Sequence, residues 1–196
     1  MSKDFFNSRA ATWDECSTEK NASRLEAMAE RLDIRPGDSV LDVGSGTGVF
    51  VPYLLKKIGA GGSLVCLDFA GEMLKIAKSK GFRGNISYLC ADIVDSSLPG
   101  DSFDIVVCYS VFPHFIDKPR ALKEIHRLLK KNGRLFICHT SGRRLINEIH
   151  RSIPEVCDHL CPENDDMRRM LIETGFNDVS IDDGMEDYLA RARKIA

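Results

Sequence analysis

The sequence predicts an α/β protein with a doubly wound, mostly parallel sheet that is covered by helices on both faces. Between residues 38 and 139, strand-like and helix-like segments alternate, as expected for right-handed βαβ units. The strand-like segments are apolar almost throughout, which is typical of strands buried on both faces. A glycine-rich turn directly follows the first of them. These three observations favour a single core built around a parallel sheet.

Helix and strand signals mark each element of this core in order. Strands are expected at residues 38–43, 62–68, 85–92, 103–110 and 134–140, and helices at 49–59, 70–81 and 117–133. Pro52 lies early in the first of these helices, where proline is best tolerated. Gly81 closes the second helix, and Asn132 with Gly133 is expected to end the third.

Further elements are expected on both sides of the core. Residues 19–34 carry apolar side chains at helical spacing, namely Leu25, Met28, Ala29 and Leu32. Helices are expected at 142–153 and 161–176, followed by two terminal strands at 178–184 and 186–195 that form a hairpin. No repeat or linker interrupts the chain, so we expect one domain over residues 1–196.

Composition and charge fit a soluble globular protein. The 196 residues are 43% hydrophobic and 29% charged, with a formal net charge of -2, which disfavours a strongly basic nucleic-acid binder. No apolar run has the length of a signal peptide core or the ~20 residues that span a bilayer. We therefore expect a cytoplasmic protein without a nucleic-acid or membrane partner, as a monomer or a homodimer.

The seven cysteines do not indicate a disulfide framework, because their number is odd and their spacing is wide. Four lie in apolar runs, where reduced thiols serve as small core residues: Cys66, Cys90, Cys108 and Cys138. Cys157 and Cys161 flank His159 at a spacing that can bind zinc or arsenic, but two local thiols do not complete a structural zinc site. We expect no metal site.

The turn at Gly44, Gly46 and Gly48 follows the first strand and opens a helix, which is where a doubly wound sheet binds nucleotides. A dinucleotide site is typical of the pattern G-x-G-x-x-G, whose third glycine is replaced here by Val49. Asp42, two residues before the turn, would also repel a pyrophosphate. An adenosyl ligand that carries an ammonium and a sulfonium would favour this carboxylate.

Acids also end the next two strands. Asp68 lies 22 residues after Gly46, about where an acid binds ribose hydroxyls. Asp92 ends the third strand, where a carboxylate can accept a hydrogen bond from the exocyclic amine of adenine while Ile93 packs against the adenine ring. Each acid alone fits a helix N-cap or a turn equally well, but three acids at successive strand ends make that interpretation weak.

These motifs resemble the class I S-adenosylmethionine-dependent methyltransferases, and among them the small-molecule enzymes similar to those of ubiquinone and menaquinone biosynthesis. VLDVGSGTG resembles the first family motif, LVCLDFAGEML the second, and residues 90–115 the third and fourth. The resemblance covers about residues 5–140. It implies a Rossmann-like, three-layer αβα fold with a seven-stranded sheet in the order 3-2-1-4-5-7-6 and an antiparallel strand 7.

The resemblance also implies how the chain is used. Residues 1–36 would form a helical cap, 37–140 the cofactor-binding core, and 141–196 the substrate-side helices and the hairpin. S-adenosylmethionine would be the methyl donor and S-adenosylhomocysteine the product. The cofactor-binding residues implied are Trp13, Asp42, Gly44, Ser45, Gly46, Thr47, Gly48, Asp68, Phe69, Met73, Ala91, Asp92, Ile93, Tyr109 and Ser110.

Methyl transfer is an in-line displacement that needs a base only if the acceptor arrives protonated. The catalytic candidates are His114 and His139, which follow strands, and Tyr109 near the sulfonium. His150 lies in the next helix, three residues after Asn147 on the same face. One hypothesis is that the three histidines converge on the acceptor pocket, where they would act on the acceptor or hold a metal or a soft element. The alternative is that His114 is a packing or gate residue and the others form a polar rim.

A small-molecule acceptor is the favoured prediction. The fourth motif, residues 108–111, lacks the N-P-P-Y pattern, which disfavours nucleic-acid or glutamine N-methylation. Arg143 and Arg144 would pair with an anionic acceptor or be solvated charges at a helix start. The alternatives are methylation of a protein side chain or RNA, methylation of a thiol or metalloid with Cys16, Cys157 and Cys161, a nicotinamide oxidoreductase, and a non-catalytic binding module.

Overall fold

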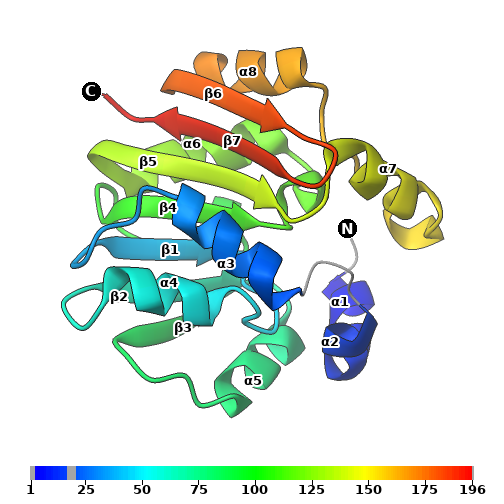
Figure 1. Ribbon diagram of the computed structural model, residues 1–196, viewed down its shortest axis with the longest axis horizontal. Helices are drawn as coiled ribbons and strands as arrows, with labels where there is room; N and C mark the ends of the chain where they lie inside the picture. Colours follow the sequence, from blue (N-terminus) through cyan, green and yellow to red (C-terminus); the bar gives the residue numbers. More distant parts are fainter. Residues whose placement is uncertain (1–2, 17–20, 196) are drawn as a thin grey trace.

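The computed structural model describes residues 3–16 and 21–195. A seven-stranded sheet runs through it in the order β3-β2-β1-β4-β5-β7-β6 (Figure 1). Its strands are β1 (Ser39–Val43), β2 (Ser63–Asp68), β3 (Ile86–Cys90), β4 (Phe103–Tyr109), β5 (Leu129–His139), β6 (Asn177–Asp183) and β7 (Tyr188–Arg193). Strands β1 to β5 pair in parallel, and β7 is antiparallel to both of its neighbours. The predicted sheet order and antiparallel strand are confirmed.

Helices cover both faces of the sheet, as predicted. On one face, α3 (Ala22–Arg31), α4 (Val51–Ile58) and α5 (Gly71–Ser79) pack on the central strands. On the other face lie α6 (Lys118–Leu128) and α8 (Asn164–Glu173). The apolar stripe predicted for α3 is buried, because Leu25, Met28, Ala29 and Leu32 are each at most 2% exposed. Asn21 begins this helix by accepting hydrogen bonds from the Ser23 and Arg24 amides.

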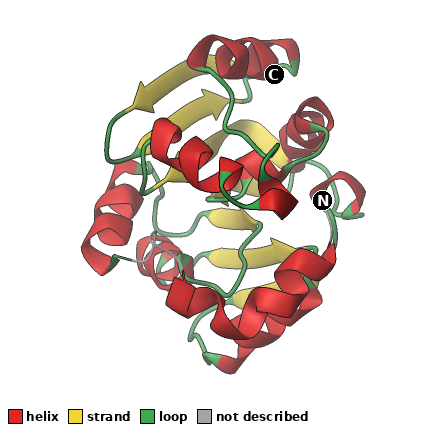
Figure 2. Cartoon of the chain, turned by 90° about the vertical axis from the view of Figure 1, so that its right-hand side faces the viewer, coloured by secondary structure: helices red, strands yellow, loops and turns green. Residues whose placement is uncertain are grey.

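Two helical segments lie beyond the carboxyl ends of the parallel strands. The N-terminal segment, residues 3–16, consists of α1 (Lys3–Arg9), η1 (Ala10–Thr12) and α2 (Trp13–Cys16). The second segment contains α7 (Arg143–Arg151) and η5 (Pro154–Val156). Figure 1 shows both at the arrowhead side of the sheet, and Figure 2 views the molecule from that side. The short helices η3 (Ile93–Asp95) and η4 (Phe112–His114) follow β3 and β4.

The boundary between α6 and β5 differs from the prediction. The helix ends at Leu128 rather than at residue 133, and β5 begins at once with Leu129. The Ser102 amide binds the carbonyl of Leu128, while Leu129 pairs with Phe103 of β4. Sheet pairing therefore takes over residues whose helical spacing alone would extend the helix.

One cysteine expectation is also wrong. Cys66, Cys108 and Cys138 are buried, but Cys90 is exposed because it ends β3, which is an edge strand. All cysteine side chains in the described part of the chain are free thiols. Within the same residues, no helix has the length and apolar character needed to cross a membrane.

Candidate active site

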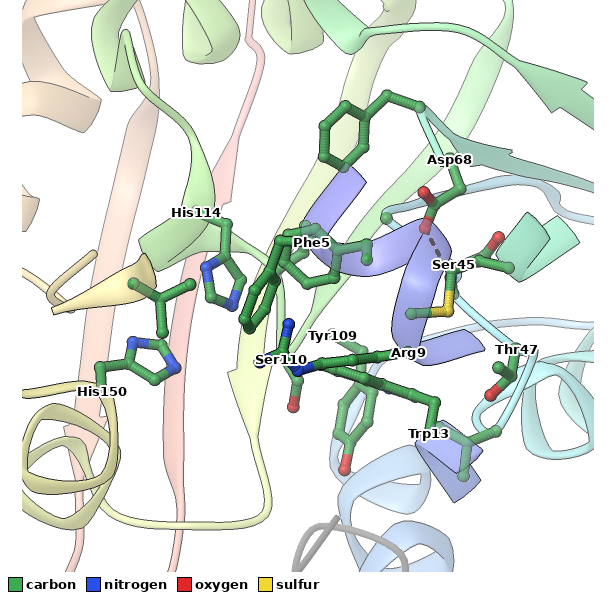
Figure 3. Close-up of a pocket in the computed structure, with 18 of the residues that line it drawn as sticks. Phe5, Arg9, Trp13, Ser45, Thr47, Asp68, Tyr109, Ser110, His114 and His150 are labelled. Carbon is green, nitrogen blue, oxygen red and sulfur yellow. Dashed lines mark hydrogen bonds between the residues drawn. The ribbon is translucent and has the colours of Figure 1, made fainter. Parts of the chain in front are cut away.

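A pocket of about 610 Å³ lies at the carboxyl ends of the parallel strands. The N-terminal segment covers one side of it and α7 borders another. Figure 3 shows Ser45, Thr47 and Asp68 on one side of the pocket and His114 and His150 on the other. The pocket therefore joins the glycine turn to the histidines in one continuous space.

The glycine loop, residues 44–48, lies at the first side of the pocket, which residues 44–47 line and Gly48 does not. Gly44, Gly46 and Gly48 all have φ between +54° and +80°, where side chains are disfavoured. A Cβ on Gly44 would come within 2.2 Å of a methyl group of Val111. The Gly44 and Ser45 amides bind the carbonyl of Leu67 in β2, so the loop is held against the neighbouring strand.

Asp68 lines the pocket at the end of β2. Its two oxygens accept hydrogen bonds from the Gly46 and Ala70 amides, each at 2.8 Å. Burial raises its pKa to about 6, although both amide hydrogen bonds act in the opposite direction. Each oxygen keeps a second lone pair, so the carboxylate can accept from two adjacent hydroxyl groups in the pocket.

Asp42 lies at the end of β1 and is only 1% exposed, so it does not line the pocket. Neither of its carboxyl oxygens has a hydrogen-bond partner in the described structure. Burial, followed by the charge of Asp68, raises its pKa to about 8. A buried acid of this kind is stabilised in its ionised form when a cation binds above it. The site therefore fits a ligand with positive charge beside the glycine loop.

The third acid occupies a different position. Asp92 is exposed and caps η3 by accepting from the Val94 amide at 3.1 Å. Neither it nor its neighbours Ala91 and Ile93 lines the pocket, whereas Phe69 and Met73 do. The assignment of Ala91, Asp92 and Ile93 to adenine stays a prediction.

The N-terminal segment is fastened over the glycine loop. Trp13 lines the pocket, and the Asp14 carboxylate accepts from the Thr47 hydroxyl at 2.6 Å. The same carboxylate pairs with Lys80 at 2.6 Å. These contacts place an aromatic wall above the first side of the pocket.

Tyr109 and Ser110 lie between the two sides of the pocket (Figure 3). The Tyr109 ring stacks on Phe50, with 4.5 Å between the ring centroids, and its hydroxyl shares a hydrogen bond with Thr140 at 2.8 Å. Ser110 has a φ of +52°, an uncommon value for a residue with a side chain. A strained residue at a strand end is typical of a functional site.

The three histidines predicted to converge all line the pocket: His114, His139 and His150. The rings of His114 and His150 lie closest, with centroids 4.8 Å apart. Burial holds the pKa of His114 well below its usual value, and neighbouring histidines add to this effect. His114 is therefore neutral at neutral pH and can accept a proton.

Much of the apolar surface of the pocket was not predicted from the sequence. Phe5 and Phe6 of α1 line it together with the acceptor wall, formed by Ile146, Ile149, Ile153 and Val156. The spacing of the three isoleucines by three and four residues is a helical signal that was available in the sequence. The contact of the N-terminal phenylalanines with this wall depends on the fold and has no local signal.

Two other groups of candidates lie off the pocket. Arg143 is nearly buried and pairs with Asp183 at 2.9 Å and with Glu163 at 2.6 Å, so the expectation of a solvated or acceptor-binding charge is wrong for it. Arg144 does not line the pocket either. Cys161 is buried, and its amide and carbonyl both bind the Asn147 side chain. Among the described residues, no group of histidine, cysteine and acidic side chains is arranged to hold a metal ion. The side chain of Cys16 lies outside the described residues.

Comparison with known proteins identifies relatives of the core. A family model described as a methyltransferase domain matches residues 41–137. The ubiquinone/menaquinone biosynthesis C-methyltransferase UbiE of Teredinibacter turnerae is 35% identical over 116 residues, which cover 57% of this chain and 47% of that protein. The chain thus spans about half the length of the first curated relatives that it matches.

Solved structures share the fold over a larger part of the chain. An S-adenosylmethionine-dependent methyltransferase from Aquifex aeolicus has a TM-score of 0.74 at 20% identity, with complete coverage of both chains. Phosphoethanolamine N-methyltransferase 2 of Haemonchus contortus, solved with S-adenosylhomocysteine and phosphomonomethylethanolamine, has a TM-score of 0.81 at 16% identity, covering 100% of this chain and 61% of that one. With the sheet order and the matched domain in agreement, residues 41–137 belong to the methyltransferase domain family, and the chain has the fold of the class I S-adenosylmethionine-dependent methyltransferases.

Proposed function

We propose that the protein transfers a methyl group from S-adenosylmethionine to a small, largely apolar acceptor. The observation that carries this proposal is the continuity of one pocket, which joins the glycine loop and Asp68 on one side to the acceptor wall and His114 on the other. Donor and acceptor would meet between these sides, where Tyr109 and Ser110 lie (Figure 3).

The donor side follows from the charges of the site. S-adenosylmethionine is the cofactor of this family, and it supplies a methyl group already activated by its sulfonium. Asp68 would bind the two ribose hydroxyls, and Asp42 would ionise beneath the ammonium. Phe69 and Met73 line the side where the adenine would lie. Trp13, held by the Asp14 contacts, would cover the ligand and exclude water.

The acceptor side follows from its apolar lining. The acceptor wall and the two N-terminal phenylalanines bury an apolar or aromatic molecule better than a polar chain. The buried His114 is the best-placed base if the acceptor arrives protonated, because its pKa keeps it neutral. His139 and Tyr109 line the same pocket and would orient the acceptor.

Calorimetric titration of S-adenosylhomocysteine and NAD tests the donor side. Asp68→Ala should weaken S-adenosylhomocysteine binding by about 10- to 150-fold, because the hydroxyls lose a charged acceptor. Asp95→Ala, a change of an exposed carboxylate after β3, should leave the affinity unaltered. Binding of NAD in place of S-adenosylhomocysteine would overturn the donor assignment. Equal affinities for the two variants would remove Asp68 from the ribose.

Transfer of a labelled methyl group to quinols, phenols, amines, thiols and arsenite tests the acceptor side. Ile149→Trp fills the acceptor half of the pocket, so it should abolish transfer while leaving S-adenosylhomocysteine affinity within about twofold. Leu145→Trp lies on the same helix but is 44% exposed and off the pocket, and should remain active. Label that enters only protein or RNA would contradict a small-molecule acceptor.

A further inference from the structure

His114 has a second histidine behind it that does not line the pocket. The Nδ1 atoms of His114 and His159 are 3.0 Å apart. Such a contact is a hydrogen bond only if one Nδ1 carries a proton and the other does not. The tautomer of one ring therefore fixes the tautomer of the other.

The surroundings keep both rings neutral. Burial is the first cause that lowers the pKa of His114 and of His159. Among residues 3–16 and 21–195, the charged and titratable groups that face the two rings are His139 from β5, His150 from α7, Lys118 from α6 and Asp158 beside His159. Lys118 is held close by donating to the carbonyls of Pro113 and Phe115, at 2.9 and 3.0 Å. Its positive charge further disfavours a protonated histidine pair.

Side chains of helix α7 hold His159 in place by binding the backbone of residues 159–161. His150 Nδ1 donates to the carbonyl of His159, which fixes the proton of His150 on Nδ1. One turn earlier, Asn147 binds the amide and the carbonyl of Cys161 at 2.8 and 3.1 Å. Because all three bonds go to backbone groups, the segment keeps its position when the His159 side chain is changed.

The two rings differ in burial, and this difference decides which ring carries the shared proton. His114 is 9% exposed and faces the apolar pocket, whereas His159 is half-buried and reaches the surface. A bare Nε2 on His114 avoids leaving an unpaired N–H donor among apolar side chains. The Nε2–H of His159 then lies on the more exposed of the two rings. This arrangement requires the shared proton to lie on Nδ1 of His114.

We propose that His159 is a positioning and relay residue that makes Nε2 of His114 a base and carries the acceptor proton out of the pocket. The inference rests on the proposed methyl transfer. The bond from the acceptor atom to the methyl carbon forms as the sulfur–methyl bond breaks, and the acceptor proton moves to Nε2 of His114. The Nδ1 proton of His114 passes to Nδ1 of His159, and the Nε2 proton of His159 passes to water. One proton leaves per turnover, and neither ring keeps a charge.

The pair returns to its starting state by the reverse path. When the product has left, water supplies a proton to Nε2 of His159, and the Nδ1 proton of His159 moves back to Nδ1 of His114. The Nε2 proton of His114 then passes to water in the open pocket. Proton balance is kept, and the site needs no other acid.

Histidine tautomers can be measured without any acceptor, by long-range proton–nitrogen NMR correlation of the ¹⁵N-labelled protein. In the wild type we expect His114 protonated on Nδ1 and His159 on Nε2. In His159→Leu, His114 should change to the Nε2-protonated form that an isolated imidazole prefers. His126→Leu removes another half-buried histidine, on α6, and should leave the His114 signals unchanged. The proposal is overturned if His114 is Nε2-protonated in the wild type or is unaffected by His159→Leu.

Steady-state kinetics distinguish a proton relay through His159 from a role in which His159 only positions His114. Gln at position 159 can still hydrogen-bond to His114 but cannot pass a proton on. With the phenol or quinol that is methylated fastest, His159→Gln and His159→Leu should both lower kcat by about 10-fold or more, with KM for the acceptor unchanged. Full turnover by His159→Gln would refute the relay. If no acceptor is methylated, the proposed function fails while the NMR result still decides the state of the pair.

Discussion

At the scale of single residues, the acid beneath the glycine loop is the most unusual group in the molecule. Asp42 is buried without a hydrogen-bond partner in the described structure, and its pKa is raised to about 8. The sequence identified this residue from its distance to the loop, but a motif carries no information on burial. Whether the acid is charged depends on the strands around it, which only the fold provides.

Asp42 should make the stability of the unliganded protein depend on pH. Since its pKa is higher in the folded than in the unfolded chain, its contribution is full below about pH 4 and is lost as the pH rises through about 8. The side chain at position 42 of Asp42→Asn cannot titrate. Between pH 5 and 7, the free energy of unfolding of this variant should therefore fall less steeply with rising pH than that of the wild type, by on the order of 1 kcal/mol per pH unit. Urea unfolding at several pH values measures this difference.

The exposed carboxylate of Asp165 on α8 provides the comparison. Asp165→Asn should follow the wild-type slope. If Asp42→Asn has the wild-type slope as well, Asp42 is already ionised in the unliganded protein and the electrostatic account of the donor side is wrong.

At the scale of elements, the glycine loop depends on close contact with the segment after β4. Gly44→Ala should destabilise the protein by on the order of 1–3 kcal/mol, because the added Cβ meets Val111 and the residue keeps a positive φ. Gly61→Ala has no atom nearer than 3.9 Å and no positive φ, so it should cost far less. Urea unfolding of both variants gives the comparison, and equal losses would mean that the loop yields to a side chain.

The N-terminal segment is a second element whose contacts can be tested. Asp14→Ala removes the hydrogen bond to Thr47 and the ion pair with Lys80. S-adenosylhomocysteine should then dissociate about 5-fold faster, because the N-terminal segment is held less tightly over the pocket. Glu15→Ala removes an exposed acid next to it and should not change the rate. Stopped-flow displacement measures both. An unchanged rate for Asp14→Ala would show that the segment does not retain the ligand.

The ends of helices and strands depend in part on contacts that a short stretch of sequence does not contain. Periodicity located each helix and strand of the core, since burial on one or both faces leaves a pattern in the residues. It extended α6 too far because residues 129–133 continue the helical pattern. Leu129 instead pairs with Phe103, more than twenty residues away in the chain. Long-range pairing of this kind has no signal in a short window.

At the scale of the whole molecule, stability should be graded across the sheet. β1 and β4 lie at its centre with nearly every residue buried, whereas β3 and β6 lie at the edges with many exposed residues. Amide hydrogen exchange should therefore be slowest in β1 and β4 and clearly faster in β3 and β6. Uniform protection across all seven strands would contradict this order.

The candidate site was predictable to the extent that it lies in contiguous motifs. The glycine loop, Asp68, Tyr109 and His114 line the pocket as the motifs suggested. His159 and the N-terminal phenylalanines were not assigned to the site, because their neighbours come from parts of the chain more than forty residues away. The sequence thus predicts the half of the pocket around the glycine loop better than the half beside α7.

The origin of the two halves of the pocket has a consequence for how such proteins diversify. The matched domain, residues 41–137, contains the glycine loop, Asp68 and His114, while the acceptor wall lies outside it. Mutations in residues 142–161 can therefore reshape the proposed acceptor side without changing the glycine loop or Asp68. Selection can then retain the proposed donor while exchanging acceptors, and transplanting residues 142–161 between relatives is a rational route to new specificity.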